Sequence, residues 1–398
     1  MLRGKHILVG ISGGIAAYKI PELIRQLRKA GAEVRVTTTK NALQFVTPLT
    51  LETLSNSKVY SDVFAAINEH QTEHISLPDW ADMMVVAPAT ANVLAKFAHG
   101  IADDALTTTF AATVARRPIV IAPAMNDKMY ENPVTQAAIA TLRSNKNTHV
   151  LDCAEGFLAC GTTGKGRMQE IDVILEAIET ALTEQTMAGR KILITAGPTR
   201  EAIDPVRYLS NHSTGKMGYA LARECARRGA EVTLISGPTA CSIQAERCTV
   251  VPVQSAQEMA EAAFGAWPSH DTAILCAAVA DFTPANVADK KIKKVPGQQT
   301  MTLDLTITTD IAAGLGSSKT AQQKLIGFAL ETHNEEQNAI LKMQKKNMDM
   351  IVLNSLQDAG AGFGYDTNKV TLLYADGHKK DLPLMDKQEV ASIIIESL

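Results

Sequence analysis

The sequence predicts an α/β protein with two doubly wound domains, and a repeated pattern carries this prediction. The chain passes from strand to glycine turn to helix to strand twice, first over residues 6–37 and again from Lys191. The stretches RKAGAEVRV and RRGAEVTLI stand at matching places in the two segments. Strand, helix and strand in this order build a parallel sheet covered by helices, so each segment predicts the start of one domain.

Apolar runs of strand length mark the individual strands, and apolar positions at helical spacing mark a first helix over 18–30 that Gly31 ends. The expected strands cover 6–10, 33–37, 83–87 and 119–122 in the first domain and 273–277 and 350–353 in the second.

The length of 398 residues fits two domains of ordinary size. A last helix of the first domain is expected over 171–182, and the polar stretch 183–190 is typical of a linker. We therefore place the domains at 1–189 and 190–398.

Composition narrows the class of protein. Hydrophobic residues make up 46% and charged residues 20%, as in soluble globular proteins, and the net charge of −3 favours neither nucleic acid nor an anionic membrane as partner. The N-terminal apolar stretch is too short for a secretion signal, and no segment approaches the ~18 apolar residues of a membrane span. The six cysteines form no CxxC pair, so we expect reduced thiols and a cytoplasmic protein.

Glycine- and proline-containing loops follow the strands of the first domain. Ser12-Gly13-Gly14 follows the first strand, Pro88 and Thr90 follow the third, and Asn126 follows the fourth. Ligands of open parallel sheets bind beyond the carboxyl ends of the strands, so these loops should converge on one crevice. The glycine turn lacks the spacing of a dinucleotide fingerprint, and it suits either an anion at a helix start or a tight turn without a ligand.

His70-Gln-Thr-Glu73-His74 matches the H-x-x-E-H pattern of inverted zinc peptidases. Pro78 follows closely and disfavours a long rigid helix, so we favour one functional histidine, His74, over a zinc site. Asn126 suits either the binding of a carboxylate or flavin edge or the N-cap of a helix. Cys160 lies in a glycine-rich stretch near Lys165 and Arg167, which suits either a flap with a proton-donating thiol or an exposed bystander.

The second domain has a long polar stretch, 204–218, between strand and helix, and we expect a loop that either binds a ligand or is disordered. Its Ser/Thr/Gly residues suit a phosphate at the helix start. Lysines cluster over 290–294, and Asp281 precedes them at a strand end. Such a cluster is either a solvated face or, with the carboxylate, a site for a nucleotide triphosphate and Mg²⁺.

These motifs together resemble a known family across essentially the whole chain. The stretches SGGIAAYK, APATAN, HISL, PAMNDKMY and ACGTTGKGRM are similar to its decarboxylase half, and ITAGPTREAIDPVRYLSNHSTGKMG, AAVADF and KIKK to its ligase half. The family is that of the bacterial bifunctional phosphopantothenoylcysteine decarboxylase/phosphopantothenate–cysteine ligases of coenzyme A synthesis. The resemblance implies a flavodoxin-like or Rossmann-like flavoprotein domain followed by a Rossmann-like ligase domain.

For the flavin half, the resemblance implies that His74 is the active-site base, Asn126 binds the substrate carboxylate and Cys160 is the acid that reprotonates the intermediate. It also implies an FMN site formed by Ser12, Gly13, Gly14, Ile15, Thr38, Pro88, Thr90 and Asn92.

For the ligase half, the resemblance implies that Asn211 orients an acyl-cytidylate and that Lys291 contacts the phosphates of CTP. Relatives commonly have Asn-Pro-Asp-Ile where this chain has Thr-Thr-Asp-Ile, which leaves the preference for CTP over ATP open unless backbone N–H groups make the contact. The implied nucleotide site comprises Asp281, Thr308, Thr309, Asp310, Ile311, Phe328, Lys342 and Lys346.

The implied partners are small molecules: 4′-phosphopantothenate, cysteine, CTP and Mg²⁺. The resemblance also implies a homo-oligomer in which flavin domains form trimers that assemble further, ligase domains pair, and active sites are shared between subunits. One alternative is a flavin- or nicotinamide-dependent reductase with a second nucleotide-binding domain, which leaves the lysine cluster unexplained. Another is a regulatory flavoprotein without activity, which the presence of His74, Asn126 and Cys160 disfavours.

Overall fold

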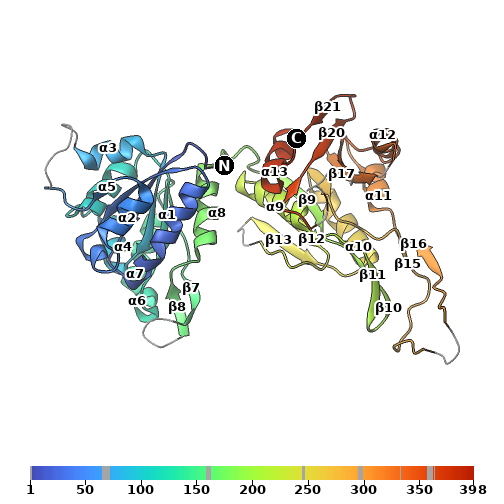
Figure 1. Cartoon of the computed structure of the whole chain (residues 1–398), viewed down its shortest axis with the longest axis horizontal. Helices are drawn as coiled ribbons and strands as arrows, with labels where there is room; N and C mark the ends of the chain where they lie inside the picture. Colours follow the sequence, from blue (N-terminus) through green and yellow to red (C-terminus); the bar gives the residue numbers. More distant parts are fainter. Residues whose placement is uncertain are drawn as a thin grey trace. The chain divides into compact units, whose positions relative to one another are not determined.

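The computed structural model describes residues 2–64, 72–157, 163–243, 247–294, 299–331, 333–355, 362 and 364–398. The chain divides into two compact units, Met1–Thr183 and Glu184–Leu398 (Figure 1).

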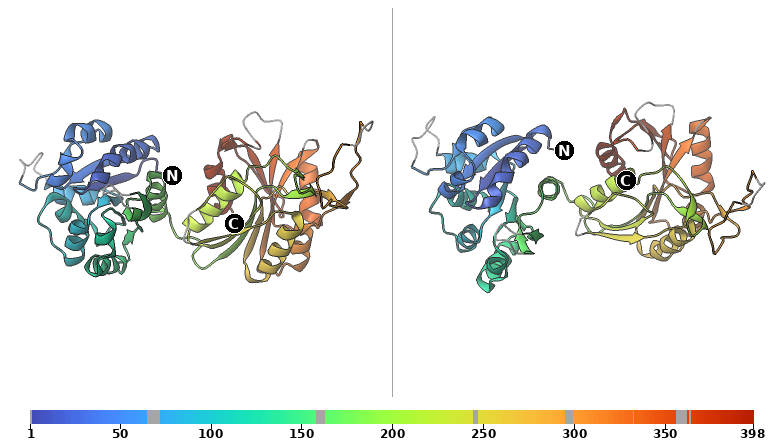
Figure 2. Two further views of the ribbon diagram at one scale, coloured as in Figure 1. Left: turned by 90° about the horizontal axis from the view of Figure 1, so that it is seen from below. Right: turned by 60° about the horizontal axis from the view of Figure 1, so that its bottom comes forward.

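A parallel sheet with helices around it forms the first unit (Figure 2). Among the described residues its strands lie in the order β3-β2-β1-β4-β5-β6. The order reverses between β1 and β4, and the carboxyl ends of strands at such a reversal form the usual ligand crevice of doubly wound sheets. The strands are β1 His6–Ile11, β2 Glu33–Thr38, β3 Val59–Tyr60, β4 Met83–Ala89, β5 Ile119–Pro123 and β6 Thr148–Val150.

The first unit has a separate hydrophobic core on each face of its sheet. Ile7 and Val9 of β1 face the core that includes helices α1 and α8, whereas Leu8 faces the core that includes α4, α5 and α7. Because both faces are buried, the strands are continuous apolar runs, the pattern from which they were predicted. The helices are α1 Ile20–Lys29, α2 Pro48–Ser55, α3 Glu73–Trp80, α4 Ala91–His99, α5 Ala105–Thr113, α6 Asp127–Glu131, α7 Pro133–Arg143 and α8 Ile171–Leu182, with 3₁₀ turns at Ile15–Lys19 and Lys40–Gln44 and a hairpin of β7 Ala154–Phe157 and β8 Thr163–Arg167.

The second unit repeats this arrangement and extends it. Within its described residues the sheet order is β13-β12-β9-β14-β17-β18-β20-β21, parallel up to β18 and antiparallel over the last two strands. The strands are β9 Lys191–Ala196, β12 Glu231–Ser236, β13 Cys248–Pro252, β14 Thr272–Leu275, β17 Lys324–Glu331, β18 Met350–Ser355, β20 Val370–Tyr374 and β21 Lys379–Asp381. The doubly wound α/β class predicted from the sequence is confirmed.

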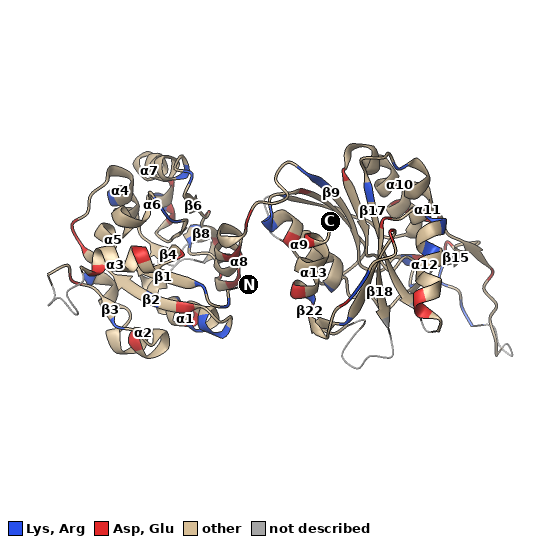
Figure 3. Ribbon diagram, turned by 90° about the horizontal axis from the view of Figure 1, so that it is seen from above, with Lys and Arg blue, Asp and Glu red and all other residues tan. Residues whose placement is uncertain are grey.

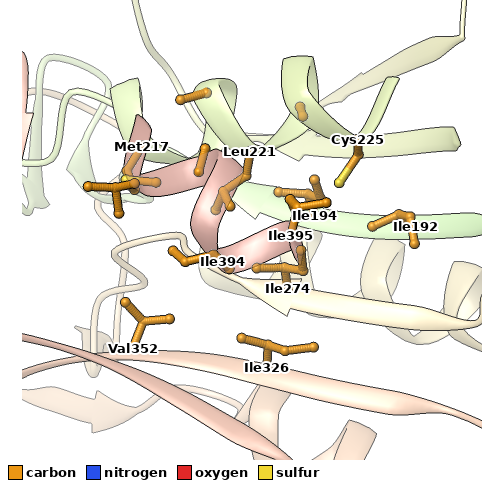
Figure 4. Packing of buried hydrophobic residues seen from close by; sticks show 14 of the residues in the cluster. Ile192, Ile194, Met217, Leu221, Cys225, Ile274, Ile326, Val352, Ile394 and Ile395 are labelled. Carbon is orange, nitrogen blue, oxygen red and sulfur yellow. The ribbon is translucent and has the colours of Figure 1, made fainter. Parts of the chain in front are cut away.

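Helices cover both faces of this second sheet. Ile192 and Ile194 of β9 lie in one core with Leu221 of α9 and Ile394 of α13 (Figure 4), and Leu193 faces the opposite core. The helices are α9 Lys216–Arg227, α10 Ala256–Ala266, α11 Ile311–Ser318, α12 Glu335–Lys345 and α13 Lys387–Glu396, with a 3₁₀ turn at Trp267–Ser269. No described helix is long and apolar enough to cross a membrane.

One local prediction, the loop before α9, needs correction. The stretch 204–218, expected as a loop, contains the strand β11 Arg207–Ser210, which pairs antiparallel with β10 Arg200–Asp204 just before it. The short strands β15 Phe282–Pro284 and β16 Leu305–Ile307 form a second antiparallel pair. A third pairing joins β19 Thr367–Asn368 to β22 Met385–Asp386. Pro78 lies inside α3 Glu73–Trp80, a helix of only 8 residues, so the expectation that no long rigid helix forms here holds.

Candidate functional sites

A cavity of about 820 Å³ opens at the carboxyl ends of the strands in the first unit. It is bounded by the loops after β1, β4 and β5, which come together as the sequence predicts. The predicted site residues that line it are Gly13, Gly14, Ile15, Thr90, Asn92 and Asn126.

Ser12 fixes the glycine turn to the neighbouring strand. Its hydroxyl donates a 2.7 Å hydrogen bond to the carbonyl of Pro88 and accepts one of 3.0 Å from the N–H of Thr90. Ser12 is fully buried, and neither Ser12 nor Pro88 lines the cavity. These two residues therefore hold the ends of β1 and β4 together, so that Gly13, Gly14 and Thr90 border the same space.

Close backbone approach explains the glycine at position 13. A Cβ atom there would lie 2.5 Å from the Cβ of Asn41, whereas at Gly14 its nearest neighbour would be Thr90 Cγ2 at 3.2 Å. Gly13 thus lets the turn pack against the segment after β2, and Gly14 keeps backbone open to the cavity.

Thr38, at the end of β2, is fully buried and does not line the cavity. Its hydroxyl has no hydrogen-bond partner among the described atoms, and the same holds for the preceding Thr37. Buried hydroxyls normally have a partner, so an additional polar group is expected near the end of β2.

The cavity fits a flavin nucleotide on three observations. Backbone of the glycine turn borders it, an unpartnered hydroxyl lies at the end of the adjacent strand, and Ile15, Val93, Met125 and Met129 supply apolar surface suited to an aromatic ring system.

We expect Thr38→Val to separate ligand binding from folding. Valine has nearly the same shape and removes an unsatisfied polar atom, so the unfolding temperature without flavin should stay the same or rise. The affinity for FMN should fall about tenfold, as expected for one lost hydrogen bond to a charged group. Fluorescence titration measures it, with Thr37→Val, on the opposite face of β2, as the matched control. Unchanged affinity in Thr38→Val would exclude this contact.

Asn126 caps a helix and also lines the cavity. Its side-chain oxygen accepts a 3.0 Å hydrogen bond from the N–H of Lys128 and so caps α6, and the residue also lines the cavity. The hairpin strand β8 lies against this segment, since the N–H of Met125 donates to the carbonyl of Gly166 at 2.9 Å. At Gly166 a Cβ atom would lie 2.3 Å from the carbonyl oxygen of Met125, so only glycine permits this approach.

The remaining predicted residues of this unit lie elsewhere. His74 lies in the first turn of α3 and is not among the residues that line the cavity. Cys160 and His70 lie outside the described residues. Across the described parts of the chain, no group of three or more His, Cys, Asp or Glu side chains could hold a metal ion.

Sequence reasoning missed a charged group at the cavity. Lys96 of α4 lines it and donates to both carboxylate oxygens of Asp103, at 2.6 and 2.9 Å, while Asp104 caps α5. The pKa of Lys96 is raised, chiefly by the hydrogen bond to Asp103. The Asp-x-x-Thr capping box, which starts at Asp104, was the available signal, but it indicates a helix start and not a cavity.

In the second unit the β10–β11 hairpin carries Asn211 to the end of β14. The Asn211 side-chain amide donates a 2.9 Å hydrogen bond to the carbonyl of Ala278. Thr199 binds the same segment. Its backbone N–H donates to the carbonyl of Ala278, and its hydroxyl accepts a hydrogen bond from the N–H of Ala280.

A buried carboxylate attaches the lysine-rich segment to this hairpin. Asp204, whose side chain is fully buried, accepts hydrogen bonds from Arg207 and from the N–H of Ile292 at 3.1 Å. Arg207 also donates to the carbonyl of Ile292 at 2.9 Å. Lys291, next to Ile292, is exposed, so its backbone is fixed while its ammonium group remains in solvent.

We expect Asp204→Asn to lower ligase activity about tenfold, because the amide cannot balance Arg207 and the lysine segment loses its anchor. A steady-state assay of ligation measures this effect, with the exposed Asp289→Asn as the matched control.

The Arg207 hydrogen bond holds the pKa of Asp204 well below its ordinary value of 3.8. Its contribution to stability is therefore complete above pH 3.8 and is lost only as the pH falls through the lower folded-state pKa. If Asp204→Asn and Asp289→Asn unfolded over the same range of acid pH, Asp204 would not have this role in stability.

The segment with the Thr-Thr substitution is tied to Asp281. The N–H of Thr308 donates to the carbonyl of Asp281 at 3.0 Å, and its hydroxyl donates to the carbonyl of Ala280 at 2.6 Å. These two hydrogen bonds hold the segment in place, and they do not require an asparagine at position 308.

Asp310 caps α11 and accepts from Lys346 at 2.9 Å. Partial burial alone would raise its pKa, but the hydrogen bonds from Lys346 and Ala313 and the nearby Lys342 lower it. Asp310, Lys342 and Lys346 therefore form one charged group, and Lys342 lies in the last turn of α12. Acidic side chains mark one end of α12 and basic side chains the other (Figure 3).

A smaller cavity of about 130 Å³ lies in the second unit. Phe328 of β17 lines it, together with residues that begin α9 and follow β14. The other predicted residues, Asn211, Asp281, Lys291, Thr308, Thr309, Asp310, Ile311, Lys342 and Lys346, do not line it.

The fold and these sites define a two-domain α/β protein with a cavity in each domain. Residues 1–183 match the flavoprotein family, and residues 187–398 match the C-terminal domain of the DNA/pantothenate metabolism flavoproteins. The chain belongs to the family of bifunctional coenzyme A biosynthesis proteins, which confirms the predicted resemblance.

Known relatives cover the whole chain. It is 47% identical to the coenzyme A biosynthesis bifunctional protein CoaBC of Bacillus subtilis over 100% of this chain and 97% of that protein. It is also 46% identical to a cysteine/cysteine sulfinic acid decarboxylase from an unknown prokaryotic organism, over 89% of this chain and 98% of that one. A crystal structure of a CoaBC C-terminal domain is 43% identical, covers 53% of this chain and 94% of its own, and has a TM-score of 0.44.

Proposed function

We propose that the two units catalyse consecutive steps of coenzyme A synthesis. The second unit ligates cysteine to 4′-phosphopantothenate with CTP, and the first unit uses FMN to decarboxylate the resulting 4′-phosphopantothenoylcysteine to 4′-phosphopantetheine. The observation that carries the proposal is a separate cavity in each unit, the first bordered by the glycine turn and Asn126 and the second by Phe328.

Ligation requires an activated carboxylate. A carboxylate oxygen of 4′-phosphopantothenate bonds to the α-phosphorus of CTP, and the bond from that phosphorus to the bridging oxygen breaks. Pyrophosphate leaves with the electron pair and an acyl-cytidylate remains. The amine of cysteine then attacks the acyl carbon, loses a proton, and CMP leaves.

In this proposal the residues of the second unit have the following roles. Asn211, held beside Ala278 at the sheet edge, orients the acyl-cytidylate, and Lys291 reaches the phosphates from its anchored backbone. Phe328 contacts the nucleotide from the small cavity, and the residues outside that cavity that complete the nucleotide site are Asp281, Thr309, Asp310, Ile311, Lys342 and Lys346. Mg²⁺ accompanies the triphosphate, since it is usually bound through substrate phosphates and few carboxylates.

Decarboxylation needs placement and proton transfer from the chain. Asn126 binds the carboxylate of the substrate, His74 acts as base, and Cys160 returns a proton to the product. Gly13, Gly14, Ile15, Thr90 and Asn92 border the cofactor, and Ser12 and Pro88 support them from behind. The hydroxyl of Thr38, unpartnered among the described atoms, binds the cofactor at the end of β2. Bound FMN supplies a reversible two-electron acceptor, so the step needs no net oxidant.

A homo-oligomer is part of this proposal. Phe64, 94% exposed, borders the first cavity beside the exposed Ile15 and Met129, which favours coverage by a second copy. His74 does not line the cavity of its own chain, which supports an active site shared between subunits. The exposed apolar side chains of the two hairpins, Val206, Tyr208, Phe282 and Ile307, favour pairing of the ligase units.

The test is incubation of the purified, FMN-loaded protein with 4′-phosphopantothenate, cysteine and either CTP or ATP, with products identified by mass. We expect CMP, pyrophosphate, CO₂ and 4′-phosphopantetheine as products. In the cell, we propose that the same reaction of small molecules takes place in the cytoplasm. A reaction with cysteine alone would instead indicate free-cysteine decarboxylation. Consumption of NADH without CTP turnover would favour the reductase alternative.

A further inference from the structure

Two lysines begin two helices at the small cavity of the second unit. Lys216 is the first residue of α9, Lys387 is the first residue of α13, and both line the cavity. Lys387 is 7% exposed, and its ammonium group donates to the carbonyl oxygens of Gly362, at 3.1 Å, and of Tyr365. Lys216 donates to Asp366 at 2.7 Å and to the carbonyl of Gly364 at 3.1 Å.

The position of Lys387 is electrostatically unfavourable, whereas Lys216 is paired with Asp366. The amino end of a helix carries partial positive charge and favours anions, yet each helix has a lysine at its first position. A buried ammonium group is costly unless a charge of opposite sign balances it. The hydrogen bonds of Lys387 to Gly362 and Tyr365 go to neutral carbonyl groups.

The neighbouring carboxylates do not balance the positive charge of Lys387. Asp366 is bound to Lys216, and Asp386 caps α13 by accepting from the N–H of Gln388. Burial and then the proximity of Lys216 lower the pKa of Lys387, and this outweighs the opposing effects of Asp366, Cys276 and Asp386. An anion in the cavity would restore the balance.

We propose that Lys216 and Lys387 form a phosphate subsite of the ligase unit. The subsite rests on the proposed ligase function and takes a phosphate group of a substrate, either from the nucleotide tail or from the end of 4′-phosphopantothenate. Ser213 and Thr214 line the same cavity and supply hydroxyl donors. If the group is the nucleotide tail, the subsite holds the pyrophosphate that leaves when the acyl–phosphate bond forms.

Lys387→Met tests the subsite, because methionine keeps much of the apolar length and removes the charge. We expect the KM for one phosphate-bearing substrate to rise at least about tenfold, as for a lost hydrogen bond to a charged group, with the KM for cysteine unchanged. A rise for CTP together with weaker inhibition by added pyrophosphate assigns the nucleotide tail. A rise for 4′-phosphopantothenate alone assigns its terminal phosphate.

Asp366→Asn is the matched control, because it removes a negative charge from the same cluster and leaves both lysines. A phosphate subsite predicts that this variant keeps or lowers the affected KM. If both variants raised the KM equally, or if Lys387→Met changed neither KM, the lysines would only tie the chain around Gly362 to the two helices, and the proposal would be wrong. Should Lys387→Met fail to fold, Lys216→Gln, at a more exposed side chain, carries the same expectation.

Failure of the phosphate subsite can be distinguished from failure of the proposed ligase function. Wild-type protein that releases no pyrophosphate from CTP would end both proposals. Active wild-type protein with an unaffected Lys387→Met variant would end only the subsite.

Discussion

Lys291→Gln should lower ligation at least about a hundredfold, while decarboxylation of supplied 4′-phosphopantothenoylcysteine continues at the wild-type rate. Loss of one group that stabilises charge developing on the phosphates costs on the order of 10²–10³ in rate. The fold is expected to be unaffected, since the side chain is exposed and the segment is held through the backbone of Ile292. Separate steady-state assays of the two reactions measure the effect.

Lys294→Gln is the control for this prediction, because it makes the same change of charge in the same segment. If the two variants lost ligation equally, the segment would act only through its general positive charge. Equal loss of ligation and decarboxylation in Lys291→Gln would contradict separate active sites in the units Met1–Thr183 and Glu184–Leu398.

The sheets were predictable because their parallel strands are buried on both faces. Ile7, Leu8 and Val9 alternate between two cores, so no polar position interrupts the run. The β10–β11 hairpin was not predictable in this way. Its strands are short and partly exposed, and their position depends on the buried Asp204, whose partner Ile292 lies far along the chain. A sequence pattern carries no signal for such a pairing.

The same distinction applies to the sites. Residues directly after strands, such as Gly13, Thr90 and Asn126, were predictable because parallel strands end at one edge. Lys96 and Lys387 were missed, since a lysine at a helix start or on a helix face is usually solvated. Only the fold places Lys387 in a cavity beside Lys216.

Asn126→Asp should lower decarboxylation at least about a hundredfold without loss of stability. Asn126 is both a helix cap and a wall of the cavity, and aspartate preserves only the first function. Asp is as good an N-cap as Asn, and its negative charge suits a helix start. Facing the carboxylate of the substrate, however, the new charge is repelled by about 4 kcal/mol at contact distance near a protein surface, which exceeds the ~2.7 kcal/mol of a hundredfold loss.

Asn132→Ala provides the comparison that isolates the cavity function. Asn132 caps α7 by accepting from the N–H of Val134 at 2.9 Å, and it does not line the cavity. This variant should lose about 1 kcal/mol of stability and keep its decarboxylase activity. Asn126→Asp should show the reverse, with unchanged thermal unfolding and bound FMN but little CO₂ release. If Asn126→Asp were active, Asn126 would only cap α6, and the substrate carboxylate would have to bind elsewhere in the cavity.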